Sequence, residues 1–286
     1  MDPLPTAAAP AVVPLLEDFS LEMTGKDTPA LEEARAFIPA GTRINVTFLG
    51  NEDPGLRLAA ARAALRYGYT PVPHLSARRL RSRAELEGIL AALRSDGTAD
   101  NVFVVGGDPT TPHGPYDDSL ALIRSGLLRT YGVRHVGISG YPEGHPAIAG
   151  PALWSAMTEK TAALAEQGLS GDVITQFGFA AAPVLTWVEA VRARGIDAPV
   201  RIGVPGPAGV KRLMAYAARF GVGTSTSIAR KYGFSLTNLM GTAGPDRFLH
   251  DLASGYDTRR HGVLKLHFYT FGGLRATSRW IADFRA

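Results

Sequence analysis

The stretch RHVGISGYPEGHPAIAGPALWSAMTEKTAALAEQGLSGDVITQFG, residues 134–178, reads as one strand–helix–strand unit. Its two ends, 134–140 and 171–178, are short runs rich in apolar residues, which is typical of strands buried on both faces. Between them, residues 152–168 carry apolar side chains at three- and four-residue spacing and end in glycine, which predicts a helix. A helix between two such strands favours a parallel pair joined by a right-handed crossover.

The same alternation extends along the rest of the chain. Strands are expected at 18–24, 43–50, 70–77, 101–107, 134–140, 171–178, 199–206 and 263–273. Helical periodicity separates them at 28–38, 55–68, 83–95, 152–168, 182–195 and 209–221. This pattern predicts an α/β fold, a closed (β/α)₈ TIM barrel. The alternative is an open doubly wound sheet, although no G-x-G-x-x-G motif follows the first strand.

Residues 17–286 are expected to form a single catalytic barrel domain, because no linker or change of composition interrupts the alternation. The region 221–255 is longer than one connection needs, so extra helices are expected between the seventh and eighth strands. Residues 1–16 are apolar, contain four prolines and lack a basic leader. We therefore expect a flexible N-terminal arm and not a signal peptide.

Composition excludes several classes of function. The chain has no cysteine, which excludes disulfides, thiolate nucleophiles and cysteine-ligated metals. The histidines show no H-x-x-x-H or H-E-x-x-H spacing, so no metal site is expected. A net charge of +4 is too small to indicate nucleic acid, and no apolar run is long enough to span a membrane. A cytoplasmic protein that binds neither is expected.

In a barrel of this kind, the loops at the carboxyl ends of the strands build the active site. Polar and aromatic residues occur at most of the expected strand ends: Glu22, Thr47, His74, Asp108, Tyr116, Tyr141, Glu143, His145, Gln176, Tyr269 and Phe271. A carboxylate facing inward at the mouth would be partly desolvated, which suits a general acid. Structural interpretations remain open: Glu22 as a surface carboxylate, Asp108 as a turn cap, and His74 and Gln176 as hydrogen-bonded interior residues.

Seven short motifs, in order, are similar to those of the methylenetetrahydrofolate reductase family. They are SLEM (20–23), INVTF (44–48), PHLS (73–76), GGDP with GPY (106–116), GYPEGHP (140–146), VITQFGF (173–179) and LHFYTFGG (266–273). Each motif alone is weak, but the ordered set from about residue 18 to 284 is specific. The resemblance implies a barrel enzyme that reduces 5,10-methylenetetrahydrofolate to 5-methyltetrahydrofolate with NADH or NADPH through bound FAD.

The resemblance also implies roles for individual residues. Glu22 matches the general acid of the family, which helps the imidazolidine ring to open, and Asp108 matches an aspartate beside the flavin and the pterin. Substrate-binding positions are Gln176, Asp108, Tyr269 and Phe271. Cofactor-binding positions are Thr47, His74, Gly107, Asp108, Tyr116, Tyr141, His145 and Lys160. The implied partner is a tetrahydrofolate substrate, and a homo-oligomer is possible in this family.

Two departures from the family pattern leave alternatives open. Gly106 stands where the flavoenzymes often have an arginine, and the helix at 152–168 offers only Lys160 where they have an asparagine and an Arg-Lys pair. One alternative is direct hydride transfer from the nicotinamide to the folate without flavin. Another is a folate-binding paralogue without turnover. The choice between NADH and NADPH, and the physiological direction, also stay open.

Overall fold

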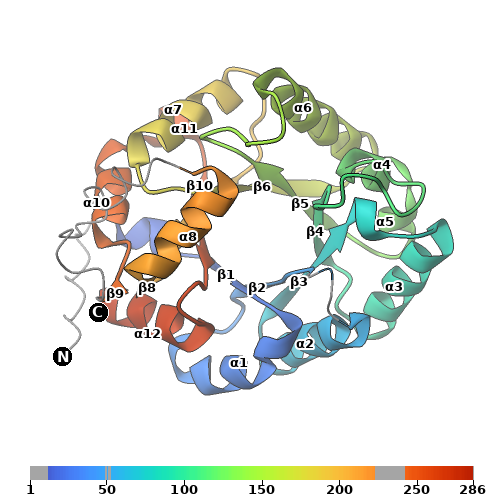
Figure 1. Ribbon diagram of the computed structural model, residues 1–286, viewed down its shortest axis with the longest axis horizontal. Helices are drawn as coiled ribbons and strands as arrows, with labels where there is room; N and C mark the ends of the chain where they lie inside the picture. Colours follow the sequence, from blue (N-terminus) through green and yellow to red (C-terminus); the bar gives the residue numbers. More distant parts are fainter. Residues whose placement is uncertain (1–11, 49, 51–52, 223–241, 286) are drawn as a thin grey trace.

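The computed structural model describes residues 12–48, 50, 53–222 and 242–285. Eight parallel strands form a closed barrel in the order β1-β10-β7-β6-β5-β4-β3-β2, which confirms the predicted (β/α)₈ fold (Figure 1). The strands are β1 Ser20–Met23, β2 Arg43–Val46, β3 Thr70–Ser76, β4 Asn101–Val105, β5 His135–Gly140, β6 Ser170–Phe177, β7 Val200–Pro205 and β10 Leu264–Tyr269. All eight lie within or beside the ranges expected from the sequence.

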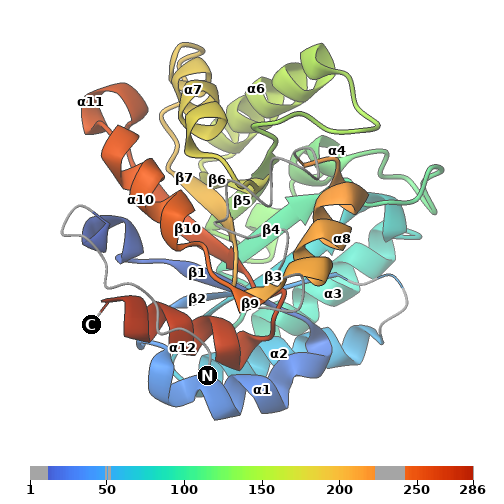
Figure 2. The same ribbon diagram turned by 60° about the vertical axis from the view of Figure 1, so that its left-hand side comes forward.

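The helices form a ring outside the barrel (Figures 1 and 2). They are α1 Thr28–Ala34, α2 Pro54–Arg66, α3 Arg83–Ser95, α4 Ser119–Arg124, α5 Leu127–Thr130, α6 Gly150–Glu166, α7 Ala181–Arg192, α8 Val210–Phe220, α10 Asp246–Gly255, α11 Thr258–His261 and α12 Leu274–Arg285. α4, α5 and α12 were not predicted. α4 and α5, of six and four residues, are too short to show a 3.6-residue period. None of the described helices is long and apolar enough to cross a membrane.

Additional elements separate β7 from β10, as the length of that region predicts. β8 Ala208–Gly209, directly before α8, pairs with β9 Thr242–Ala243 in a two-stranded antiparallel sheet. α10 and α11 follow before the last strand, and α10 packs against α7. The rest of the expected insertion, residues 223–241, lies outside the described residues.

The end of the predicted N-terminal arm is docked and not flexible. Val13–Leu16 forms a 3₁₀ helix that contacts β10, with Pro14 in its first turn. Val12, Leu15 and Leu16 are fully buried in the core. The prediction of a flexible arm is therefore wrong for residues 12–16, because burying these apolar side chains stabilises the docked conformation. Residues 1–11 lie outside the described part of the chain.

The amino-terminal end of the barrel is filled by buried, paired charges. The Arg201 guanidinium contacts Asp172 Oδ2 at 2.7 Å and Asp18 Oδ2 at 3.1 Å. His135 Nε2 lies 3.3 Å from the other Asp172 oxygen. Burial alone would raise the pKa of Asp172, but His135 and Arg201 outweigh it and hold that pKa at about 2. The network requires every member, since a buried charge without a partner is costly.

We expect Asp172→Asn to lower the free energy of unfolding by about 3 kcal/mol near neutral pH, because it removes the buried counter-charge of Arg201 and leaves only the half-exposed Asp18 beside it. The folded pKa of Asp172 is depressed, so its contribution is present above the unfolded pKa of about 4 and is lost as the pH falls toward 2. Urea denaturation at about pH 7 and about pH 3 measures both effects, and the variant should show the smaller pH dependence.

Asp283→Asn is the control, because it removes a carboxylate from an exposed ion pair with Arg279. We expect it to change the unfolding free energy by no more than about 0.5 kcal/mol. Equal effects of the two substitutions would contradict the role assigned to the buried network.

Candidate functional site

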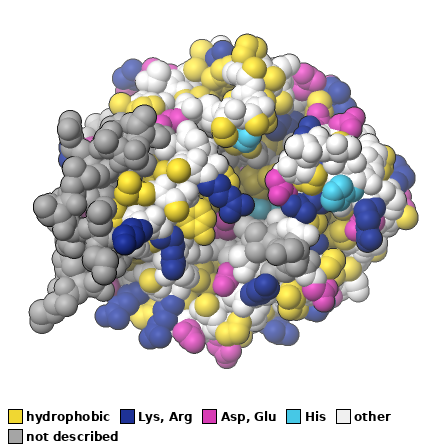
Figure 3. Space-filling view, viewed as in Figure 1, with side chains coloured by type: hydrophobic (Ala, Val, Ile, Leu, Met, Phe, Trp, Pro, Cys, Tyr) yellow, Lys and Arg dark blue, Asp and Glu magenta, His cyan; other side chains and the backbone are white. Residues whose placement is uncertain are grey.

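The carboxyl ends of the eight strands form the mouth of the barrel, and α8 lies across this end in front of the strands (Figure 1). In the same view, the surface is hollowed near its centre (Figure 3). Hydrophobic atoms lie within the hollow, and histidine, lysine and arginine side chains surround it.

Glu22 lies on β1, with its side chain inside the mouth of the barrel. Its side chain is 22% exposed, and Oε2 is 3.6 Å from Nε2 of His267 on β10. Its own carbonyl oxygen accepts a hydrogen bond of 2.8 Å from the Thr270 hydroxyl. A carboxylate with one neutral or cationic neighbour and partial access to solvent can both lose and regain a proton, as a general acid must.

His267 is a site residue that sequence reasoning did not single out. Its side chain is 1% exposed, and Nδ1 lies 2.9 Å from the hydroxyl oxygen of Ser20. The ring is perpendicular to that of Tyr269 at 4.8 Å. The alternation of His267 with Tyr269 on one strand places both inside the barrel, which is the signal that could have found it.

His74 lies deeper in the mouth, where it is buried. Nε2 is 3.3 Å from Asn45 Oδ1, and the ring contacts that of Phe103 at 4.7 Å. Burial lowers its pKa to about 4, although the nearby Glu22 opposes the shift. His74 is therefore neutral near pH 7, and it has the protein partners of an interior histidine.

An aromatic cluster covers the β6, β10 and α8 side of the mouth. The Phe271 ring stacks on Tyr216 at 4.1 Å and on Tyr269 at 5.7 Å. Phe177 contacts both Phe271 and Tyr269 edge to face. Tyr269 donates a hydrogen bond of 3.0 Å to the Thr175 carbonyl oxygen, and burial raises its pKa well above the usual value. A planar ligand would find flat apolar surfaces here.

Gln176, expected to bind substrate, has a local partner instead. Its Oε1 accepts a hydrogen bond of 3.1 Å from the backbone N–H of Phe177. The strand is irregular at this point, with a register shift between Ile174 and Phe177. This is the neighbouring-backbone bond that the structural interpretation of Gln176 expected, and the amide N–H₂ group remains available as a donor.

Asp108 is held by Arg79 at the outer edge of the mouth. The guanidinium donates to Oδ1 and Oδ2 at 2.5 to 2.8 Å, yet the Asp108 side chain remains 74% exposed. Burial would raise its pKa, but hydrogen bonds from Arg79 lower it overall. Gly107 has φ of +95°, and a Cβ there would lie 2.3 Å from the Ser76 hydroxyl oxygen. The turn therefore requires glycine, and it presents the Asp108 carboxylate at the edge of the mouth.

The loop after β5 carries the next pair of expected residues. The Tyr141 and His145 rings contact each other edge to face at 5.2 Å. Burial raises the pKa of Tyr141 and lowers that of His145. Nδ1 of His145 accepts a hydrogen bond of 3.1 Å from the backbone N–H of Ala147, which orients the ring. The electrostatic coupling of Tyr141 to Tyr269 places this loop beside the aromatic cluster.

Three other expected residues have partners outside this group. Tyr116 is buried in the hydrophobic core, where Arg83 and Glu87 of α3 influence its pKa. Lys160 is buried on α6 in the outer ring, and burial lowers its pKa against the opposing effect of Asp118. The Thr47 hydroxyl donates to the Met23 carbonyl oxygen at 3.1 Å.

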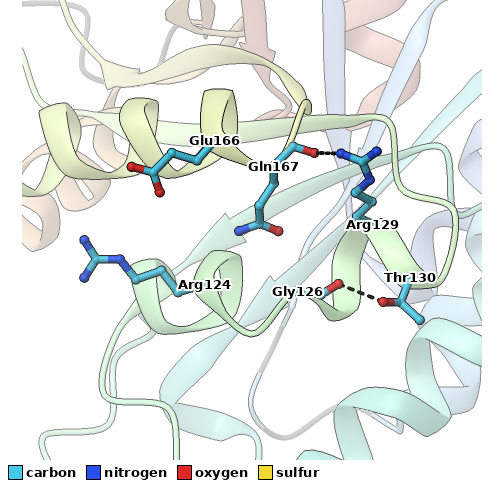
Figure 4. A pocket seen from close by; sticks show the side chains of 6 residues that line it. All are labelled: Arg124, Gly126, Arg129, Thr130, Glu166 and Gln167. Atoms are coloured by element: carbon cyan, nitrogen blue, oxygen red, sulfur yellow. Dashed lines mark hydrogen bonds between the residues drawn. The ribbon is translucent and has the colours of Figure 1, made fainter.

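A separate pocket of about 850 Å³ lies in the outer ring between the ends of α4, α5 and α6 (Figure 4). It is lined by Arg124, Gly126, Arg129, Thr130, Glu166 and Gln167. The guanidinium of Arg129 donates to the carbonyl oxygen of Gln167, and the Thr130 hydroxyl donates to that of Gly126. Arg124 pairs with Glu159 at 3.8 Å, and Glu166 adds a carboxylate, so the pocket is lined by charges of both signs.

Comparisons with known proteins give a weak similarity. No family model matches the chain. Among solved structures, the chain is similar to a glycoside hydrolase family 20 β-N-acetylglucosaminidase, with 10% sequence identity and a TM-score of 0.42 over 95% of this chain and 69% of that chain. A similarity this weak says nothing about activity. The closed barrel rests on the strand pairing of the chain itself.

We expect Gly107→Ala to lower the free energy of unfolding by about 1–2 kcal/mol, because it combines a positive φ with a close contact to Ser76. Gly106→Ala is the matched control, since a Cβ at that position meets nothing within 4 Å. Its effect should stay within about 0.5 kcal/mol. Chemical denaturation of the two variants checks this, and equal stabilities would contradict the turn geometry assigned to Gly107.

Proposed function

We propose that the protein reduces 5,10-methylenetetrahydrofolate to 5-methyltetrahydrofolate with a hydride that originates from NADH or NADPH. The observation that carries the proposal is Glu22, a partly exposed carboxylate inside the barrel mouth, 3.6 Å from a buried histidine. Its position at a strand end is where barrel enzymes place catalytic groups. The ordered family motifs of the sequence supply the substrate class.

The chemistry assigned to Glu22 is one proton transfer. The protonated carboxyl gives its proton to N10 of the folate, the bond between N10 and the methylene carbon breaks, and an iminium forms at N5. A hydride then adds to the methylene carbon and yields the methyl group. The nicotinamide is oxidised, the folate is reduced, and Glu22 regains its proton from solvent through its exposed edge.

The aromatic cluster supports the binding of a planar substrate. Tyr216 and Phe271 are stacked within 13° of parallel, and Phe220 and Tyr269 stack beside them. These rings are only partly buried, so their exposed parts offer apolar surface to a flat ring. Hydride transfer requires donor and acceptor to be stacked closely with water excluded. Asp108 would accept hydrogen bonds from the pterin N–H groups through the oxygen positions that Arg79 leaves open.

The expected FAD site is not assembled as one set. Tyr141 and His145 contact each other on the loop after β5, but the side chain of Tyr116 belongs to the core beside α3, and Lys160 lies in the outer ring near Asp118. The side chains of Thr47 and His74 bond to other protein groups. These residues do not fit the flavin as a group, so no step is routed through it. This arrangement favours the direct transfer of hydride from the nicotinamide as the second candidate.

We expect Glu22→Gln to lower kcat by roughly 100-fold or more, because the amide cannot supply the proton. Folate affinity should stay within a few fold, because the amide preserves the shape of the side chain. Steady-state kinetics and folate binding by calorimetry measure the two effects separately.

Glu17→Gln is the control, because Glu17 is an exposed glutamate that precedes the same strand. It should leave both kcat and folate affinity unchanged. Unaltered turnover in Glu22→Gln would remove the general acid from the proposal. Folate binding without turnover in the wild type would instead support the non-catalytic paralogue.

The absorbance spectrum of the purified protein separates the two hydride routes. Direct transfer predicts a colourless protein that oxidises NADH or NADPH when methylenetetrahydrofolate is added. Bound flavin would give a yellow protein with a band near about 450 nm, which is the flavin region. A yellow protein that loses activity when the flavin is removed would overturn the direct route and restore FAD as the carrier.

A further inference from the structure

Residues 106–117 form the loop that joins β4 to α4 and carries Asp108; we call it the β4 loop. It contains no helix or strand, and most of its side chains are exposed. Prolines at positions 109, 112 and 115 have no N–H group to donate. The loop therefore has no hydrogen-bond ladder of its own, and the groups that fix its path must come from elsewhere in the chain.

The backbone of Arg78 bonds to the β4 loop at two points. Arg78 lies in the short 3₁₀ helix Ala77–Arg79, which follows β3. Its N–H donates to the Gly106 carbonyl oxygen at 2.9 Å, and its own carbonyl oxygen accepts from the His113 N–H at 2.8 Å. The turn after β3 and the β4 loop therefore lie side by side.

The side chain of Arg78 adds two more bonds to the same loop. Its guanidinium donates to the carbonyl oxygens of Asp117 at 2.6 Å and of Pro109 at 3.3 Å. A guanidinium presents five N–H donors in one plane, so a single side chain can bind two carbonyl groups. The bonds to Gly106 and Pro109 lie on either side of Asp108 along the chain, so they fix the backbone that carries this carboxylate.

The neighbouring arginines act on different parts of the chain. Arg79 binds the Asp108 carboxylate itself. Within the described residues, the hydrogen bonds that join the β4 loop to other parts of the chain all go to Arg78 or Arg79. Arg81 belongs to the same basic stretch, but its side chain is 76% exposed and pairs with Glu85. One arginine thus holds the loop backbone, and the next holds the carboxylate.

We propose that Arg78 is a positioning residue for Asp108: it fixes the backbone of the β4 loop, from which the carboxylate projects toward Arg79. The catalytic meaning of this inference rests on the proposed function, in which Asp108 accepts hydrogen bonds from the substrate. Its structural content, a loop whose conformation depends on one guanidinium, can be tested without turnover.

The structural test is amide hydrogen exchange of the full-length protein, followed in peptides that cover the β4 loop. Arg78→Met keeps an unbranched side chain and removes every donor, so the loop amides, including that of His113, should exchange about tenfold faster. Arg81→Met is the matched control, because the Arg81 guanidinium pairs with Glu85 and not with the loop. Its loop should exchange as in the wild type. Equal loop exchange in the two variants would overturn the inference.

The kinetic test asks whether Arg78 acts through Asp108. A hydrogen bond that holds the substrate equally in the ground state and the transition state affects KM and not kcat. Arg78→Met should therefore raise KM for methylenetetrahydrofolate about tenfold and change kcat by less than about twofold. In an Asp108→Ala background, the same substitution should raise KM by less than about twofold more. Fully additive effects on KM, or an unchanged KM in Arg78→Met, would show a merely structural role.

Arg78→Lys is a second, milder variant that keeps the inference testable if Arg78→Met does not fold. Lysine keeps the positive charge but lacks the planar fork that binds two carbonyl groups. We expect loop exchange and KM to lie between those of the wild type and Arg78→Met, at about threefold above the wild type. Wild-type exchange and KM in Arg78→Lys would overturn the inference, because a charge alone would then suffice.

The two tests separate this inference from the proposed function. If the wild type reduces no folate, the proposed function fails, while hydrogen exchange still decides whether Arg78 fixes the β4 loop. If the wild type turns over and Arg78→Met behaves like Arg81→Met, the inference fails and the proposed function stands.

Discussion

The short hydrogen-bonded seam between β1 and β10 is the interaction on which the rest of the structure depends. It joins the first and last strands of the barrel through two register pairs, Ser20 with His267 and Leu21 with Phe268. Leu21 and Phe268 are fully buried, and Phe268 packs edge to face on Phe19. Ser20 and His267 contact each other instead. The pairing that closes the barrel therefore also fixes the neighbour of Glu22, so the site cannot loosen without strain on the closure.

The charged side chains at the two ends of the barrel interior differ in their burial and in their partners. At the amino end, Arg201 and Asp172 are buried and fully paired, as a low-dielectric environment requires. A small apolar layer of Val72, Phe103 and Ile174 lies within the barrel. At the mouth, Glu22 keeps partial exposure and a single histidine contact. The charges at the amino end stabilise the fold, whereas the Glu22 carboxylate at the mouth remains partly accessible to solvent.

The sequence was informative where local patterns repeat and uninformative where partners are distant. Buried parallel strands and amphipathic helices have periods that a short window reveals, so all eight strands were predicted. The short α4 and α5 helices left no such pattern, and the apolar residues 12–16 gave no sign of where they would dock. The Ser20–His267 contact joins residues 247 positions apart, and the Arg79–Asp108 pair joins positions 29 apart. Such contacts follow from barrel closure and loop conformation, which no local window contains.

Two carboxylates at one mouth differ in what they can do because their partners differ. Arg79 remains cationic at every accessible pH, so it keeps Asp108 ionised and suits it to accept hydrogen bonds from a ligand. An imidazole, unlike a guanidinium, can be neutral, and either ring nitrogen can then carry the proton. Glu22 has one nitrogen of His267 at 3.6 Å and remains 22% exposed to solvent. The proposed proton donor is therefore Glu22 and not Asp108, because a general acid must release and recover a proton in each turnover.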